Sequence, residues 1–162
     1  MPSKRNTTKI KSLDLYNRKL GRAPQSVWQE TKLTWLNLAD NHLTEISEEI
    51  GALTKLRMLD LGHNDLSSIP DSLFDLKRLE FLYISNNKLK DISPNISKLK
   101  ALIYLNFTDN QITKLPEEIG ELPSLIEFRL YNNQIESLPE VYWQPAKPTR
   151  TPRHEQQVDF TA

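Results

Sequence analysis

Apolar and polar positions along this chain recur with a constant period of 23 residues. The segment 102–123 can be laid on 79–100, then on 56–78 and on 33–55, by successive shifts of one period. In each segment leucine or a similar residue takes the first, fourth, sixth and eleventh positions, and asparagine takes the ninth. A constant period in this range is typical of a solenoid, in which every repeat forms one coil of a continuous stack.

The predicted core consists of seven positions in each coil. These are offsets 1, 4, 6, 11, 14, 18 and 21, counted from Leu33 in the second repeat, and all 28 such residues in repeats 2 to 5 are apolar. A continuous stacked core explains this uniformity. Burial stabilises the fold by about 1.5–3 kcal/mol for each side chain, which opposes the loss of chain entropy.

Each repeat changes its periodicity part of the way along. In residues 35–39 the leucines at 36 and 38 alternate with other residue types, which predicts a strand with offsets 4 and 6 inward and offsets 3, 5 and 7 outward. The later spacing of Ile46, Ile50 and Leu53 predicts a short helix or 3-10 turn on the opposite side. Parallel strands stack about 4.8 Å apart and helices about 10 Å apart, so the stack should curve with its strands inside.

The asparagine at offset 9 has a predicted structural role. Where the strand turns away, backbone N–H and C=O groups enter the interior without partners in the sheet. A buried carboxamide can donate and accept hydrogen bonds there, from coil to coil, and its removal should cost about 1–3 kcal/mol. The five residues at this offset are Asn41, Asn64, Asn87, Asn110 and Asn133.

The two ends depart from the pattern. Residues 1–9 are polar and basic and are predicted to be a disordered arm. The first repeat opens at Ile10, carries Arg18 at the asparagine offset and ends on Glu30 in place of the last leucine. Terminal repeats of a solenoid are often atypical, because they have one neighbour instead of two. The predicted solenoid therefore spans residues 10–143 and contains six repeats.

The C-terminal stretch 144–162 contains three of the ten prolines and has no amphipathic period, so it is predicted to be disordered. No capping helix is visible in the sequence. Val141, Tyr142 and Trp143 are candidates to fold over the open end of the last coil. Without such a cover, the last coil presents an apolar face and an unpaired strand edge. That edge favours self-association, or indicates that the natural protein continues.

Composition excludes several kinds of partner and location. The chain has 21 basic and 21 acidic residues, and this balance argues against nucleic-acid and membrane binding. It has no cysteine, no apolar run behind its basic N-terminus and no long apolar segment. These features predict a cytoplasmic protein without disulfides. Export by a system that needs no cleaved signal stays open as an alternative.

The repeat resembles the cytoplasmic 23-residue class of leucine-rich-repeat proteins, written LxxLxLxxNxLxxLPxxIxxLxxL. Residues 102–122 match it with Phe107 and Ile112 at two of its leucine positions, whereas Ser47 and Ser93 replace its proline in two repeats. The resemblance implies an α/β solenoid: a right-handed superhelix shaped as a horseshoe arc, with a concave parallel sheet and short helices or 3-10 turns on the convex side. Similar repeats occur in Ras-scaffold, Roco and bacterial proteins, where the concave face usually binds a protein and the repeats are not catalytic.

Outward strand positions identify the predicted binding face. Large apolar side chains at offset 3 should line up across neighbouring strands, with polar residues beside them, and such a patch favours protein binding. The alternative interpretation is that this row packs against itself, as aromatic neighbours in sheets do. The candidate partner-binding residues are Trp35, Asn37, Met58, Asp60, Phe81, Tyr83, Tyr104, Asn106, Arg129 and Tyr131.

No other chemistry is predicted. His42 and His63 lie near acidic residues beyond the strands and are interpreted as solvated, not as metal ligands. There is no catalytic set, no glycine-rich phosphate loop and no cofactor motif. The predicted function is therefore a scaffold or protein-interaction module. The alternatives are a regulatory or sensor part of a larger signalling kinase or GTPase, or a secreted bacterial effector.

Overall fold

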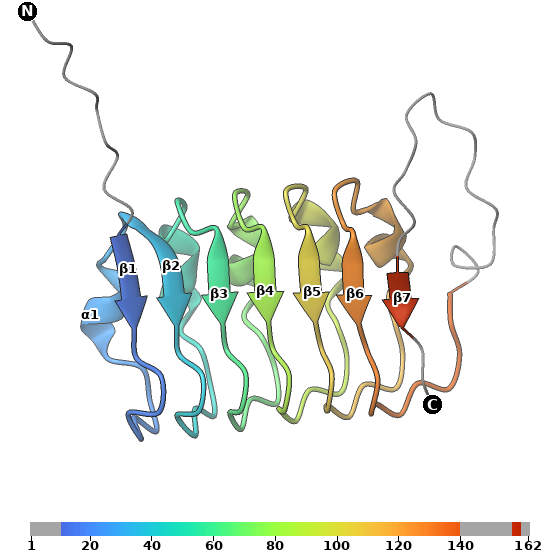
Figure 1. Ribbon diagram of the computed structural model, residues 1–162, viewed down its shortest axis with the longest axis horizontal. Coiled ribbons are helices and arrows are strands. Elements are labelled where there is room, and N and C mark those ends of the chain that lie inside the picture. The colour runs from blue at the N-terminus through green and yellow to red at the C-terminus, as the bar shows by residue number, and fades with distance from the viewer. Residues whose placement is uncertain (1–10, 140–156, 160–162) are drawn as a thin grey trace, which may run out of the picture.

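The computed structural model describes residues 11–139 and the backbone of 157–159. These residues form one parallel sheet whose seven strands lie side by side in the order of the sequence (Figure 1). The strands are β1 (Lys11–Asp14), β2 (Leu33–Asn37), β3 (Met58–Asp60), β4 (Phe81–Tyr83), β5 (Tyr104–Asn106), β6 (Glu127–Arg129) and β7 (Gln157–Asp159).

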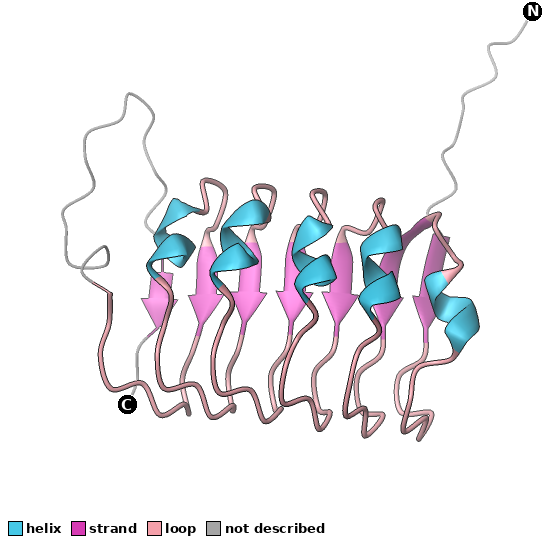
Figure 2. Cartoon of the chain, turned by 180° about the vertical axis from the view of Figure 1, so that it is seen from behind, coloured by secondary structure: helices cyan, strands magenta, loops and turns pink. Residues whose placement is uncertain are grey.

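Short helices form a second layer behind the sheet (Figure 2). The first is an α-helical turn and the others are 3-10 helices, as the sequence predicts. They are α1 (Gln25–Trp28), η1 (Glu48–Ala52), η2 (Asp71–Asp75), η3 (Pro94–Lys98) and η4 (Glu117–Glu121). Each helix follows one strand and precedes the next, which gives the predicted α/β solenoid. None of the described helices is long and apolar enough to cross a membrane.

The register of the sheet reproduces the period of the sequence. Trp35 of β2 pairs with Met58 of β3, Met58 pairs with Phe81 of β4, and Phe81 pairs with Tyr104 of β5. Residues 23 positions apart therefore lie next to one another in space. The predicted row of large outward side chains is confirmed as a continuous line across four parallel strands.

The core agrees with the predicted inward positions. Of the seven offsets in repeats 2 to 5, every residue is buried except Ile69, which is partly buried. Phe74 of η2 and Trp28 of α1 are also buried, although neither occupies one of these offsets. Both belong to the helix layer, where a wider spacing between neighbouring elements leaves room for large side chains.

The asparagine ladder is confirmed, and Asn64 illustrates it. Its Oδ1 atom accepts the N–H groups of Asn41 at 3.1 Å and Leu43 at 2.9 Å. Its Nδ2 atom donates to the carbonyls of Leu38 at 3.1 Å and Leu61 at 2.9 Å. Each asparagine thus bonds backbone groups of its own coil and of the preceding coil, where these groups have no sheet partner.

The helix starts explain why serine can replace proline in two repeats. Ser47 and Ser93 each accept the N–H group two residues later at 3.2 Å, and so cap η1 and η3. Pro70 and Pro116 occupy the same place before η2 and η4 without a side-chain cap. Both solutions suit a helix start, because proline presets φ and serine satisfies a free N–H group.

One turn conformation recurs that the sequence analysis does not predict. The residue before the asparagine ladder has a positive φ, between 50° and 58°, in six successive coils. Asparagine, aspartate and histidine tolerate this left-handed region better than most residues, and they fill all six places. These residues are Asn17, Asp40, His63, Asn86, Asp109 and Asn132.

The C-terminal end differs from the prediction. Residues 157–159 form β7, which pairs in parallel with β6 through Phe128↔Val158 and its two flanking pairs. The prediction of disorder for 144–162 is therefore wrong over these three residues, and the edge of β6 is not unpaired. An open strand edge gains hydrogen bonds from any extended segment that reaches it, and no repeat period is needed for that. The arm 1–9, Ile10 and the cover 141–143 lie outside the described residues.

Candidate partner-binding face

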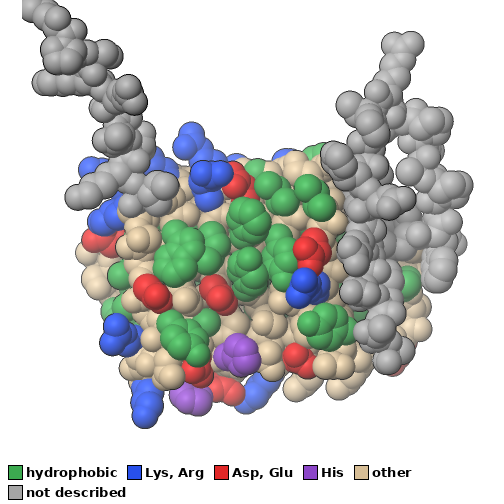
Figure 3. Space-filling view, viewed as in Figure 1, with side chains coloured by type: hydrophobic (Ala, Val, Ile, Leu, Met, Phe, Trp, Pro, Cys, Tyr) green, Lys and Arg blue, Asp and Glu red, His purple; other side chains and the backbone are tan. Residues whose placement is uncertain are grey.

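The outward side chains of the strands form what we call the sheet face, opposite the helix layer. Hydrophobic side chains gather over the middle of this face, with charged and histidine side chains around them (Figure 3). Five large side chains from β2 to β5 are half-buried there, and all five are predicted partner-binding residues. They are Trp35, Met58, Phe81, Tyr83 and Tyr104.

All of these side chains except Tyr104 line a groove of about 440 Å³, which we call the sheet-face groove. It is lined by Thr34, Trp35, Arg57, Met58, Glu80, Phe81 and Tyr83. Two of these residues form a bidentate ion pair: Arg57 Nε donates to Glu80 Oε1 at 2.8 Å, and Arg57 Nη2 donates to Oε2 at 2.7 Å. The two charged groups of the groove therefore neutralise each other, and its remaining surface is mainly apolar.

The C-terminal part of the apolar row packs against itself. The rings of Tyr83 and Tyr104 lie 4.8 Å apart at 36°. The guanidinium of Arg129 lies 5.6 Å from the centre of the Tyr104 ring and bonds Glu127 at 2.5 Å. Burial raises the pKa of both tyrosines. The interpretation of a self-packed row thus describes the tyrosine end, whereas Trp35 has no ring partner within the described residues.

Polar residues at offset 5 have a role in the turn that the sequence analysis missed. In four coils an Asp or Asn oxygen accepts the N–H group two residues later, at 2.9–3.0 Å, where the strand ends. The available signal was an Asp or Asn just before each turn, since these side chains commonly bond their own backbone. The four residues are Asp14, Asn37, Asp60 and Asn106.

Asp60 combines this turn role with an unusual electrostatic position. Its Oδ1 atom accepts the N–H of Gly62 at 2.9 Å. Burial raises the pKa of Asp60, and the hydrogen bond from Gly62 and the nearby His63 offset only part of that effect. No ion pair within residues 11–139 involves Asp60.

The structure does not bring all predicted residues to the groove. Asn106, Arg129 and Tyr131 are half-buried on the C-terminal part of the sheet face and do not line the groove. Conversely, the groove contains Thr34 and two charged residues from offset 2, which the sequence analysis did not single out. Strict alternation along a strand does not identify them, because offset 2 lies where the chain enters the strand from the helix layer.

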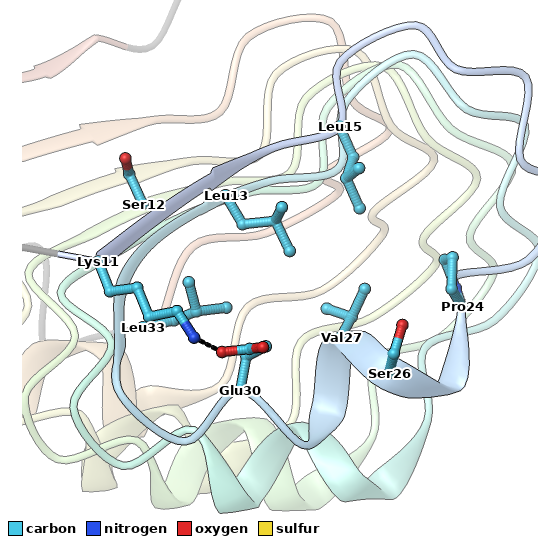
Figure 4. Close-up of a pocket in the computed structure, with 9 residues that line it drawn as sticks. All are labelled: Lys11, Ser12, Leu13, Leu15, Pro24, Ser26, Val27, Glu30 and Leu33. Carbon is cyan, nitrogen blue, oxygen red and sulfur yellow. Dashed lines mark ion pairs between the residues drawn. The ribbon is translucent and has the colours of Figure 1, made fainter.

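A second cavity of about 270 Å³ lies at the N-terminal end (Figure 4). Leu13, Val27 and Leu33 point into it from the strand and helix layers, and Lys11 forms an ion pair with Glu30 at its rim. Within the described residues, this cavity is an end of the hydrophobic core, where the first coil has a neighbour on one side only. We interpret it as a consequence of the stack and not as a binding site.

His42 and His63 lie among charged and polar rim residues. His42 Nδ1 is 3.5 Å from Asp65 Oδ2, and that carboxylate also binds Lys88 at 2.6 Å. Lys88 is the main reason that the pKa of Asp65 is lowered. His63 Nε2 is 3.4 Å from the amide nitrogen of Asn86. Across 11–139, no group of three His, Cys, Asp or Glu side chains is arranged to hold a metal ion.

A parallel solenoid in which repeats 2 to 5 each carry one strand, one ladder asparagine and one short helix defines the class of protein. Family models agree: one described as leucine rich repeat matches residues 31–89, and one described as leucine rich repeats (2 copies) matches 77–119 and 100–143. The chain belongs to the leucine-rich-repeat family. Domains of this family are generally protein-binding modules and are typically non-catalytic.

Solved structures from bacteria and plants are similar to this chain. A leucine-rich-repeat protein of Leptospira interrogans is 29% identical, with a TM-score of 0.75, over 85% of this chain and 41% of its own. Internalin InlF of Listeria monocytogenes is 27% identical, with a TM-score of 0.64, over 70% and 32%. The plant peptide hormone receptor RGFR1, solved in complex with RGF2, is 34% identical, with a TM-score of 0.71, over 79% and 22%. A search of curated proteins finds no match.

Proposed function

We propose that this chain binds a partner protein on its sheet face, with the sheet-face groove as the centre of the contact. The observation that carries the proposal is the apolar lining of that groove, formed by Trp35, Met58 and Phe81 on three adjacent strands. Monomeric proteins rarely expose such a contiguous patch unless it binds something, and buried aromatic anchors supply much of the energy of protein interfaces.

The comparisons support this kind of function. The plant receptor is a peptide hormone receptor solved with RGF2, so a similar solenoid belongs to a protein that binds a peptide ligand. In our proposal Trp35, Met58 and Phe81 are the anchors, while Asn37 and Asn106 mainly hold the turns. The tyrosine pair and Arg129 form the C-terminal boundary of the contact. The cytoplasmic location stays a prediction from the sequence.

The test is a double substitution in the groove, Trp35→Ala with Phe81→Ala. Both side chains are half-buried on the surface of the sheet, so the far-UV spectrum and melting temperature should be nearly unchanged. Affinity capture with the wild-type chain as bait should recover a partner that the double variant fails to bind. Tyr16→Ala is the matched control, because Tyr16 is a large side chain, 54% exposed, outside the groove.

Three results would contradict the proposal. Retained binding by the double variant would place the contact elsewhere. A sharp fall in melting temperature would show that the apolar row holds the solenoid together, as the self-packing interpretation requires. Equal losses of binding in the double variant and in Tyr16→Ala would also exclude the groove as the centre of the contact.

A second candidate function is that of a regulatory or sensor part of a larger signalling protein. The chain spans 41% of the Leptospira protein and 22% of the plant receptor, so both of those chains extend well beyond the part that this chain matches. A stop codon directly after Ala162, together with a monomer in solution, would argue strongly against this candidate. Further coding sequence with a kinase or GTPase domain would favour it.

A further inference from the structure

The carboxylate of Asp60 lies at the border of the sheet-face groove. Asp60 follows Met58 by two residues on β3, so both side chains project from the same face of the sheet. Its Cα partner on β4 is Tyr83, which also lines the groove. Asp60 is half-buried, although no residue within 11–139 forms an ion pair with it.

The fold does not require a negative charge at this position. Asn37 and Asn106 occupy the same offset in their coils and accept the same turn hydrogen bond at 2.9 Å with a neutral amide oxygen. Asp60 performs this role with Oδ1 at the same distance and leaves Oδ2 without a described partner. Partial burial of an unpaired carboxylate is unfavourable, since the charge loses water without a compensating partner. The charge therefore needs an explanation outside the fold.

Among residues 11–139, the charged groups around Asp60 offer no free cation. Arg57 is held by both oxygens of Glu80 across the groove. Arg129 is held by Glu127 and by the ring of Tyr104. The other ionisable groups that act on Asp60 are His63 and Asp14, and Asp14 adds negative charge. His63 is exposed, and its Nε2 atom lies at the amide of Asn86. An apolar groove thus borders on an uncompensated negative charge.

We propose that the partner places a lysine or arginine side chain on Asp60, next to an aromatic or large aliphatic anchor that fills the groove over Met58 and Phe81. This inference rests on the proposed function and specifies the chemistry of its partner. Charge complementarity carries it: a cation beside the anchor would neutralise the carboxylate of Asp60, which has no ion pair within residues 11–139.

The geometry also predicts the spacing of the two partner residues. Met58 and Asp60 are two residues apart along a strand, which corresponds to about 6.6 Å. In an extended segment, side chains two residues apart project from the same side at this distance. The partner should therefore carry its basic residue two positions from its apolar anchor. One further position of separation is within reach, because lysine and arginine have long side chains.

The experiment uses a phage-displayed library of random linear peptides as the probe. It is selected on the full wild-type chain and, in parallel, on Asp60→Asn. This substitution should preserve the turn, because asparagine makes the same hydrogen bond at positions 37 and 106. Peptides selected on the wild-type chain should contain an aromatic or large aliphatic residue and a Lys or Arg two or three positions away. Selection on Asp60→Asn should retain the apolar residue and lose the preference for the basic one.

Affinity measurements on a synthetic selected peptide then test the pair directly. Asp60→Asn should weaken binding roughly tenfold, as should replacement of the peptide's basic residue by norleucine. The two changes together should cost little more than either one, because both remove the same interaction. Asp14→Asn is the matched control: it removes an equally unpaired but exposed carboxylate from the same offset in β1, away from the groove, and should change the affinity little.

The outcomes distinguish a failure of this inference about Asp60 from a failure of the proposed function. Apolar peptides without a basic residue, bound equally well by Asp60→Asn, would overturn this inference and leave the proposed function intact. Additive losses in the double cycle, or a larger loss from Asp14→Asn, would also overturn it. Failure to select any peptide that Trp35→Ala with Phe81→Ala weakens would overturn the proposed function itself.

Discussion

The two sides of strand β3 differ in the side chains that they accept. Leu59 points inward and is fully buried, and its counterparts in repeats 2 to 5 are all leucine. Met58 and Asp60 flank it and point outward, and their offsets vary from coil to coil between aromatic, aliphatic, amide and acidic residues. Every inward position must hold an apolar side chain that packs between neighbouring coils, whereas the side chains on the sheet face can differ from coil to coil. Specificity for a partner can therefore reside only in the positions that break the repetition.

The same contrast holds for polar groups. Asn64 on the inside has both polar atoms of its amide bonded to backbone groups of its own and the preceding coil. Asp60 on the outside has one oxygen bonded to its own turn. A buried polar group must find its hydrogen-bond partners within the protein, whereas a polar group at the surface can find them in a ligand. Three substitutions, with expected effects that decrease from the first to the last, test this comparison.

The largest effect is expected from Leu59→Ala. Leu59 is completely buried between two coils, and removal of such a side chain leaves a cavity that costs about 2–5 kcal/mol. Met58→Ala is the matched control on the same strand and should cost clearly less, because Met58 is half-buried. Chemical denaturation measures both. Equal losses would show that the two sides of the strand contribute alike, and would remove the basis of the comparison.

Asn64→Ala should have the next largest effect. It would leave buried N–H and C=O groups of two neighbouring coils without partners, at a cost of about 2–3 kcal/mol in the free energy of unfolding. Gln134→Ala, which removes an exposed amide, should change the stability by less than about 0.5 kcal/mol. A loss for Asn64→Ala as small as that of the control would mean that water replaces the amide in the ladder.

Asp60→Asn should have the smallest effect, and one of opposite sign. The folded-state pKa of Asp60 is raised by burial, so its ionised form destabilises the fold. This penalty is present above the raised pKa and disappears as the pH falls below the ordinary value of 3.8. Asp60→Asn should therefore increase the stability slightly at neutral pH, and its advantage should shrink in acid.

Urea denaturation of both proteins across the acidic range measures that difference. Asp14→Asn should give a smaller gain of the same sign, because Asp14 is exposed and its charge contributes to the raised pKa of Asp60. A neutral-pH loss of stability in Asp60→Asn, or an advantage that grows in acid, would show that Asp60 is stabilised by its surroundings. A cation supplied by the partner would then not be needed to compensate the charge of Asp60.

The sequence alone determined the architecture. The 23-residue period, the seven apolar offsets and the asparagine ladder were all predictable, because each coil buries itself against copies of the same pattern. The outward row from Trp35 to Tyr104 followed as well, since equal offsets pair in a parallel sheet without slippage.

The tertiary structure decided which of those outward side chains remain available. It stacks Tyr83 on Tyr104, neutralises Arg57 with Glu80 and leaves Asp60 without a counterion within residues 11–139. It also adds β7, from a stretch that has no repeat, to the edge of β6. The physical reason is the same throughout: inward positions are set by a pattern that every coil shares. Contacts on the face and at the ends depend on side-chain pairs and chain segments that occur once.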